Sequence, residues 1–167
     1  IEDAMQNERL IFLAAQKDPM TEEPGAKEIY RVGTVCRILR MLKLPDGHFK
    51  VLIHGIEKAK VTRFVNKKTY YHVNIRLIPD RSVEEIDLEH QALMRNVREN
   101  CEKILNIKGE YTGEIGMLLD EIEHPGKLAD LVSSNLKLKT EEAQGLLEEE
   151  DPVQRLNQVN NYLTREV

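Results

Sequence analysis

The spacing of the apolar residues changes once along this chain of 167 residues, and that change limits the folds it can adopt. Before Pro79 the apolar residues gather in short, β-branched runs, which predict strands. After Pro79 they recur at intervals of three, four and seven residues, which predict amphipathic helices. The sequence therefore predicts an α+β protein, with a partly closed β barrel over residues 1–80 and a helical bundle over residues 81–167.

Five runs in the first part are rich in β-branched and aromatic residues, and each predicts a strand. They are residues 9–16, 30–42, 48–55, 59–65 and 70–78. Between the second and third runs, Pro45 fixes φ, Asp46 can bond its own backbone, and Gly47 can take a positive φ, so a tight turn is expected. This turn makes the two runs a β-hairpin. Residues 17–28 have no apolar pattern and predict a surface loop.

Helical signals begin soon after Pro79. Ser82 and Glu85 have the spacing of a capping box, which predicts a long helix starting there. Its apolar stripe is Ile86, Leu93, Val97, Cys101 and Ile104. Shorter helices are expected around residues 115–122 and from Pro125, Thr140 and Pro152, the last of them capped by Asp151. We expect this last helix to be cut short at Val167, because no end signal precedes it.

Motifs for catalysis are missing from the sequence. Gly126 and Lys127 are followed by Leu128, so they do not form the phosphate-binding loop of an ATPase. Ser133 and Ser134 fall inside a predicted helix without the glycine turn that exposes a nucleophile. We therefore expect this chain to have no catalytic residues and to bind no cofactor.

Metal binding is also not expected. Asp87 precedes His90, and Glu121 precedes His124, by three residues, as in di-metal helical bundles, but two further inward carboxylates are missing and His124 stands before a proline. The two cysteines lie far apart, so we expect two buried, reduced thiols.

Charge and hydropathy limit the possible partners. No apolar run approaches the roughly 20 residues that cross a bilayer, so no membrane partner is expected. The formal charge of −5 combines +4 up to Asp80 (14 basic and 10 acidic residues) with −9 from Arg81 onward (10 basic and 19 acidic). The positive charges lack interleaved aromatic residues, so nucleic acid is an unlikely partner.

An apolar patch at the end of the hairpin is the candidate binding site. Leu52 alternates with Lys50 and His54 and is therefore an apolar residue on a polar face of its strand. Leu44 and Pro45 stand at the turn, and Met41 lies just before them. We predict that Met41, Leu44, Pro45 and Leu52 contact exposed apolar segments of other proteins.

Five stretches resemble, in order, the N-terminal domain of the Lon protease family. They are residues 15–19 (AQKDP), 22–25 (EEPG), 30–55, 124–132 (HPGKLADLV) and 146–156 (LLEEEDPVQRL). The resemblance implies a PUA-like β lobe joined to a helical bundle. It also implies a cytoplasmic domain that binds damaged or unfolded proteins and supports assembly of a homo-oligomer, a hexamer for the whole protein. ATP, magnesium and the serine protease site would belong to other parts of such a protein.

Two features depart from the family pattern. The chain opens inside the expected first helix at Ile1, so we expect the family's N-terminal strands to be missing. His54 and His124 stand where the family has acidic residues, so the helix from Pro125 is expected to lose a preferred cap. Two alternatives stay open: a stand-alone adaptor or ligand-binding protein of the same fold, and an RNA-binding protein, which the charge of −5 disfavours.

Overall fold

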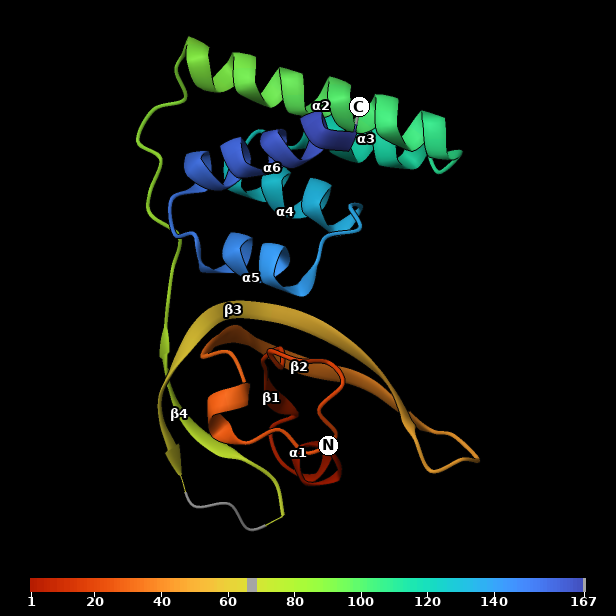
Figure 1. Cartoon of the computed structure of the whole chain (residues 1–167), viewed down its shortest axis with the longest axis vertical. Helices are drawn as coiled ribbons and strands as arrows, with labels where there is room; N and C mark the ends of the chain where they lie inside the picture. The colour runs from red at the N-terminus through yellow and green to blue at the C-terminus, as the bar shows by residue number, and fades with distance from the viewer. Residues whose placement is uncertain (66–68, 167) are drawn as a thin grey trace. The chain divides into compact units, whose positions relative to one another are not determined.

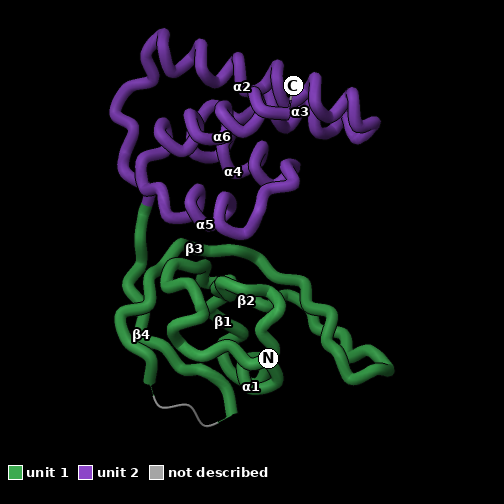
Figure 2. Tube along the Cα trace, viewed as in Figure 1, with its two compact units in different colours: residues 1–79 green, residues 80–167 purple. Residues whose placement is uncertain are grey.

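The computed structural model describes residues 1–65 and 69–166. It divides into two compact units, Ile1–Pro79 and Asp80–Val167, shown in green and purple in Figure 2. The first unit holds the sheet and a short helix, α1 (Glu2–Gln6). The second unit is helical in the described residues.

The first unit is built on an antiparallel sheet of four strands in the order β1-β2-β3-β4. The strands are β1 (Leu10–Leu13), β2 (Val32–Lys43), β3 (Phe49–Val65) and β4 (His72–Leu77). The expected partly closed barrel is wrong for the described residues, because the sheet is open there. β1 pairs with the base of β2 and β4 with the far end of β3, so these short outer strands cover different parts of the hairpin and do not pair.

β3 replaces two predicted strands. The sequence predicts separate strands over residues 48–55 and 59–65. In the structure the strand continues through them with a change of register, in which Gly55 pairs with Cys36 and Glu57 with Val35. The extra residue is absorbed as a β-bulge, which bends a strand without ending it.

The predicted hairpin turn is confirmed. Gly47 has a φ of 88°, in the left-handed region that favours glycine. The His48 backbone N–H donates to Asp46 Oδ1 at 3.0 Å. The Leu44 N–H donates to the His48 carbonyl at 2.7 Å, and so starts the ladder that joins β2 to β3. The predicted loop over residues 17–28 also holds, except for a 3₁₀ turn at Ala26–Glu28.

The second unit packs five helices around one apolar core. They are α2 (Leu88–Lys108), α3 (Gly113–Glu121), α4 (Pro125–Ser134), α5 (Thr140–Glu148) and α6 (Pro152–Glu166). The predicted stripe of α6 is confirmed, because Leu156, Val159 and Leu163 are all fully buried. Burial of each of these three side chains contributes about 1.5–3 kcal/mol to stability. The expectation that the helix is cut short at Val167 concerns a residue outside the described ones.

The start of α2 differs from the prediction. Ser82 was expected to cap it, but α2 begins at Leu88 with Asp87 as N-cap, whose Oδ1 accepts from the His90 N–H at 2.8 Å. Residues 81–87 form neither helix nor strand, and within them the Arg81 N–H donates to the carbonyl of Glu150 at 2.9 Å. Ser82 therefore lies in an irregular segment ahead of the helix.

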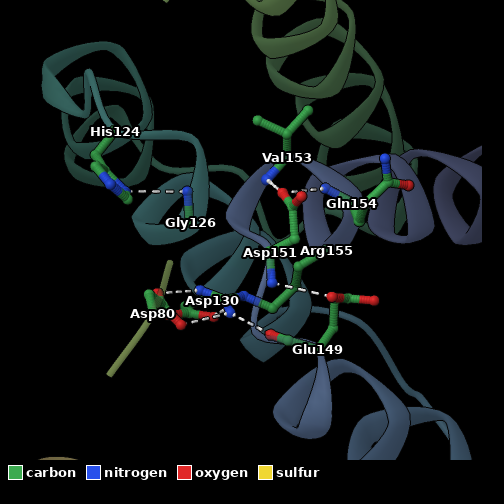
Figure 3. A network of polar contacts seen from close by, with 9 residues as sticks. All are labelled: Asp80, His124, Gly126, Asp130, Glu149, Asp151, Val153, Gln154 and Arg155. Carbon is green, nitrogen blue, oxygen red and sulfur yellow. Dashed lines mark hydrogen bonds and ion pairs between the residues drawn. The ribbon is translucent and has the colours of Figure 1, made fainter. Parts of the chain in front are cut away.

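His124 corrects a second expectation. It was expected to leave α4 without a preferred cap, but its Nδ1 accepts from the Gly126 N–H at 3.1 Å, as Figure 3 shows. The imidazole therefore satisfies one of the free N–H groups at the helix start. Asp151 caps α6 as predicted, accepting from the N–H groups of Val153 at 2.9 Å and Gln154 at 3.2 Å.

A buried arginine joins three segments of the helical unit. Arg155 of α6 is 2% exposed, and its Nη1 and Nη2 donate to the two carboxylate oxygens of Asp80 at 2.9 and 2.7 Å. Nη1 also donates to the Glu149 carbonyl at 2.8 Å, and Nε lies 3.0 Å from Asp130 Oδ1 of α4 (Figure 3). Burial alone would lower the pKa of Arg155, but the hydrogen bond to Asp80 and the nearby acidic charges raise it above its ordinary value.

Replacing Arg155 by methionine is expected to destabilise the helical unit by about 3 kcal/mol, because the carboxylates of Asp80 and Asp130 lose their counter-charge. The free energy of unfolding in urea measures this. Arg165→Met is the matched control, since Arg165 lies on the same helix and pairs with Glu142 at 2.9 Å but is 61% exposed. The control is expected to cost less than about 1 kcal/mol. Equal losses for the two variants would contradict the importance of the Arg155 pairing.

The two cysteines are buried and free, as the sequence predicts. Burial, together with the charge of Glu102, raises the pKa of Cys101 to about 11. At pH 8 the thiolate fraction of Cys101 is then about 100-fold lower than that of an ordinary thiol. We expect iodoacetamide to alkylate Cys101 in the folded protein at least 100-fold more slowly than in urea, measured by mass spectrometry on a Cys36→Ala variant. Similar rates in the two conditions would show that the thiol is accessible.

Candidate functional site

The hairpin of β2 and β3 extends beyond the rest of the sheet (Figure 1). β1 pairs with β2 as far as Arg37, and the carbonyl of Arg9 still accepts from the Ile38 N–H at 2.8 Å. β4 pairs with β3 only from Ala59 onward. Within the described sheet, residues 39–53 therefore form a two-stranded ribbon whose strands pair only with each other. We call this ribbon the arm.

Cross-strand pairs in the arm couple cations with apolar groups. Arg40 pairs with Leu52, Leu42 with Lys50, and Lys43 with Phe49. The ammonium of Lys43 lies 5.7 Å from the centre of the Phe49 ring, within range of a cation–π interaction. The fourth pair, Met41 with Val51, is apolar on both strands. The arm thus offers apolar surface in a positively charged setting.

The structure separates the residues that the sequence grouped as one patch. Met41 lies opposite Val51 and is half-buried, whereas Leu52 lies opposite Arg40 on the other face and is 56% exposed. Leu44 and Pro45 stand together at the turn, with Leu44 half-buried and Pro45 exposed. Leu52 is therefore the candidate with the most exposed apolar surface on a strand of the arm.

Other exposed apolar residues of the hairpin escaped the sequence analysis. Leu42 is 59% exposed and shares the face of Leu52, because their cross-strand partners Lys50 and Arg40 lie on that same face. Leu39, at 47%, is the extra residue of a bulge between Ile38 and Arg40. A bulge changes which face each later residue occupies, so alternation counted along one strand cannot reveal Leu39. Leu42 could have been found from the pairing register of the hairpin.

The other polar candidates serve the fold. Asp87 caps the helix that contains His90, and His124 caps α4. The Ser133 and Ser134 hydroxyls donate to the carbonyls of Asp130 and Leu131 at 3.0 and 2.7 Å, within their own helix. Over residues 1–65 and 69–166, no group of three or more His, Cys, Asp or Glu side chains could hold a metal ion. No helix in this part of the chain is long and apolar enough to cross a membrane.

A groove of about 780 Å³ along α2 is a weaker candidate than the arm. One of its cations, Arg98, is already engaged, with Nε donating to the carbonyl of Leu119 at 2.8 Å and Nη2 to that of Ile122 at 2.6 Å. These carbonyls lie at the C-terminal end of α3, which Arg98 therefore caps. Arg98 thus stabilises a helix end, whereas the arm leaves apolar side chains exposed.

Replacing Gly47 by alanine is expected to destabilise the tip of the arm, because a side chain at its φ of 88° costs about 1–2 kcal/mol. Gly145→Ala in α5 is the matched control, since nothing lies within 4 Å of its added Cβ and the helix favours alanine by about 0.5–1 kcal/mol. Amide hydrogen exchange over residues 39–53 measures the first effect. We expect faster exchange only for Gly47→Ala, and unchanged exchange would contradict the turn geometry.

Known proteins resemble this chain over its whole length. A family model described as "ATP-dependent protease La (LON) substrate-binding domain" matches residues 1–165. The Lon protease of Desulfatibacillum aliphaticivorans is 51% identical over 167 residues, which cover 100% of this chain and 20% of that protein. Lon protease 1 of Bacillus subtilis (strain 168) is 37% identical over 166 residues, which cover 99% and 21%. The chain thus spans about one fifth of the length of these relatives.

Solved structures support the fold. The N-terminal domain of a Mycobacterium avium complex Lon protease matches with a TM-score of 0.76 over 100% of this chain and 84% of that one. A Lon N-terminal domain protein from Xanthomonas campestris matches with a TM-score of 0.62, over 96% and 80%. Each is 18% identical in sequence, so these likenesses concern the fold alone.

Proposed function

The chain belongs to the family of ATP-dependent protease La (LON) substrate-binding domains, and we propose on that basis that its arm captures damaged or unfolded proteins. The observation that carries the proposal is the exposure of Leu42 and Leu52 on one face of a ribbon that has no further strand beside it in the described sheet. Apolar groups exposed together in this way are typical of interaction surfaces.

The strength of such capture follows from the areas involved. Leu42 and Leu52 are already about half buried in the arm, so covering the rest contributes about 1 kcal/mol each. Met41, Leu44 and Pro45 add smaller contacts near the turn, and the flexible thioether of Met41 adapts to partners of different shape. A surface of this kind binds weakly and accepts many sequences, as a protein that selects unfolded chains requires.

Replacing Leu52 by aspartate tests the proposal. The new carboxylate would face Arg40, so the arm is expected to keep its pairing while its apolar face loses a contact. Fluorescence anisotropy with a labelled, reduced and carboxymethylated protein as unfolded probe is expected to show a Kd at least fivefold higher. The double variant with Leu42→Asp is expected to bind more weakly still.

Leu77→Asp is the matched control for that titration. Leu77 is a leucine of the same sheet and is also 56% exposed, but it lies on β4, away from the arm. Its variant is expected to bind the unfolded probe as the original chain does. If Leu52→Asp also binds unchanged, the arm is not the capture surface.

In the whole protein, we propose that this domain recruits substrates to an ATP-dependent serine protease in the cytoplasm and supports its homo-oligomer. The relatives named Lon protease are about five times as long as this chain, which leaves room for ATP, magnesium and the protease site elsewhere. A reading frame that continues into a phosphate-binding loop after Val167 would support this role. A stop codon soon after it would instead support the stand-alone adaptor.

A further inference from the structure

The outer edge of β3 is open over the length of the arm and beyond. The strand runs from Phe49 to Val65, but its pairing with β4 begins only at Ala59. The described strands therefore leave the edge from Phe49 to Glu57 without a neighbour on the side away from β2. Every second residue of such an edge directs its backbone N–H and C=O outward, where another extended chain can pair with them.

The outer edge of β2 is a shorter alternative. β1 and the carbonyl of Arg9 occupy it up to Ile38, which leaves only the stretch from Leu39 to Lys43. A bulge lies at the start of that stretch, between Ile38 and Arg40, and interrupts the regular spacing of backbone groups. The first register change of β3 lies near Gly55, so the free edge from Phe49 to Gly55 offers the longer regular ladder.

The charge around this edge is positive, although the chain as a whole is acidic. From Arg37 to Glu57 the hairpin carries four basic residues, Arg37, Arg40, Lys43 and Lys50, against two acidic ones, Asp46 and Glu57. Its formal charge is therefore +2, while the whole chain has −5. Two copies of the arm repel each other at such an edge, and positive charge is a common protection against unwanted strand pairing. An acidic strand would meet no such repulsion.

We propose that a captured protein binds as an added β-strand along the free edge of β3 from Phe49 to Glu57, and that segments alternating apolar with acidic residues bind best. This inference rests on the proposed function and names its substrate class and binding mode. Backbone hydrogen bonds would supply an affinity that is independent of sequence. Ile53, which is 38% exposed and lies on the face away from Lys50, would contact the apolar side chains of the added strand.

Lys50 and Arg40 would supply the preference for acidic residues. Lys50 lies on the free strand itself, and Arg40 lies opposite Leu52 on the neighbouring strand, so both cations are on the same face. A carboxylate that alternates with apolar groups on the added strand would therefore lie within reach of a cation. Opposite charges across neighbouring strands stabilise pairing, and like charges weaken it.

N-methylated peptides test the binding mode without altering the protein. The parent probe is a labelled peptide of about ten residues that alternates valine with glutamate, long enough to follow the free edge at roughly 3.4 Å per residue. One derivative is N-methylated at the valines, and another at the residues between them. Strand addition uses only one of these two sets of N–H groups. We expect one derivative to bind at least tenfold more weakly than the parent and the other to bind within about threefold.

Charge-changed partners test the specificity. A peptide with lysine in place of glutamate is expected to bind the original chain at least fivefold more weakly, with the difference shrinking as salt is raised. Lys50→Glu is expected to reduce or reverse this preference. Lys103→Glu is the matched control, because Lys103 is an exposed lysine on α2, and it is expected to leave the preference unchanged.

The outcomes separate this inference from the proposed function. If the two N-methylated derivatives bind equally, or if the parent peptide does not bind while the unfolded protein does, strand addition is overturned. Equal binding of the acidic and basic peptides overturns the specificity. In each case the proposed capture survives as long as Leu52→Asp weakens binding of the unfolded protein. If Leu52→Asp has no effect but one methylation pattern still blocks the peptide, the apolar patch is wrong and the free edge stands.

Discussion

The helical unit depends on the charge of one buried side chain. Arg155 is removed from water, and it stays charged because Asp80, Asp130 and the carbonyl of Glu149 surround it. A buried guanidinium requires partners in fixed directions, so it restricts where each of these segments can lie. Close packing follows from this restriction. At Gly126 an added Cβ would lie 2.8 Å from Arg155 Nη2, so α4 can approach only because that position has no side chain.

This network brings together two stretches of the chain that are far apart in sequence. Two of the stretches that resemble the family, HPGKLADLV and LLEEEDPVQRL, supply Asp130, Glu149 and Arg155. They also supply the two helix caps His124 and Asp151 that Figure 3 shows beside the network. These residues lie far apart in sequence and meet in three dimensions. Spacing along the chain cannot reveal such a pairing, and the sequence analysis missed Arg155 for that reason.

Local signals predicted the parts of the fold that local interactions decide. The turn at Gly47, the cap at Asp151 and the buried stripe of α6 each depend on neighbouring residues, and each was found. The errors lie where two local signals compete or where strand pairing decides. Asp87 caps α2 in place of Ser82, and a β-bulge near Gly55 joins two predicted strands into one. The bulge at Leu39, which depends on strand pairing, likewise decides which apolar residues of the arm share a face.

Asp80 occupies a special place, because it directly follows Pro79, the last residue of the β unit. Any tension carried along the backbone from the β unit enters the helical unit at this residue. Its carboxylate is held by two hydrogen bonds from Arg155, and the next residue, Arg81, is tied to Glu150. These bonds would have to break before the start of α2 could be pulled away. Asp80 and Arg81 thus anchor the first residues of the helical unit, so this segment can detach only together with a loss of contacts at the start of α6.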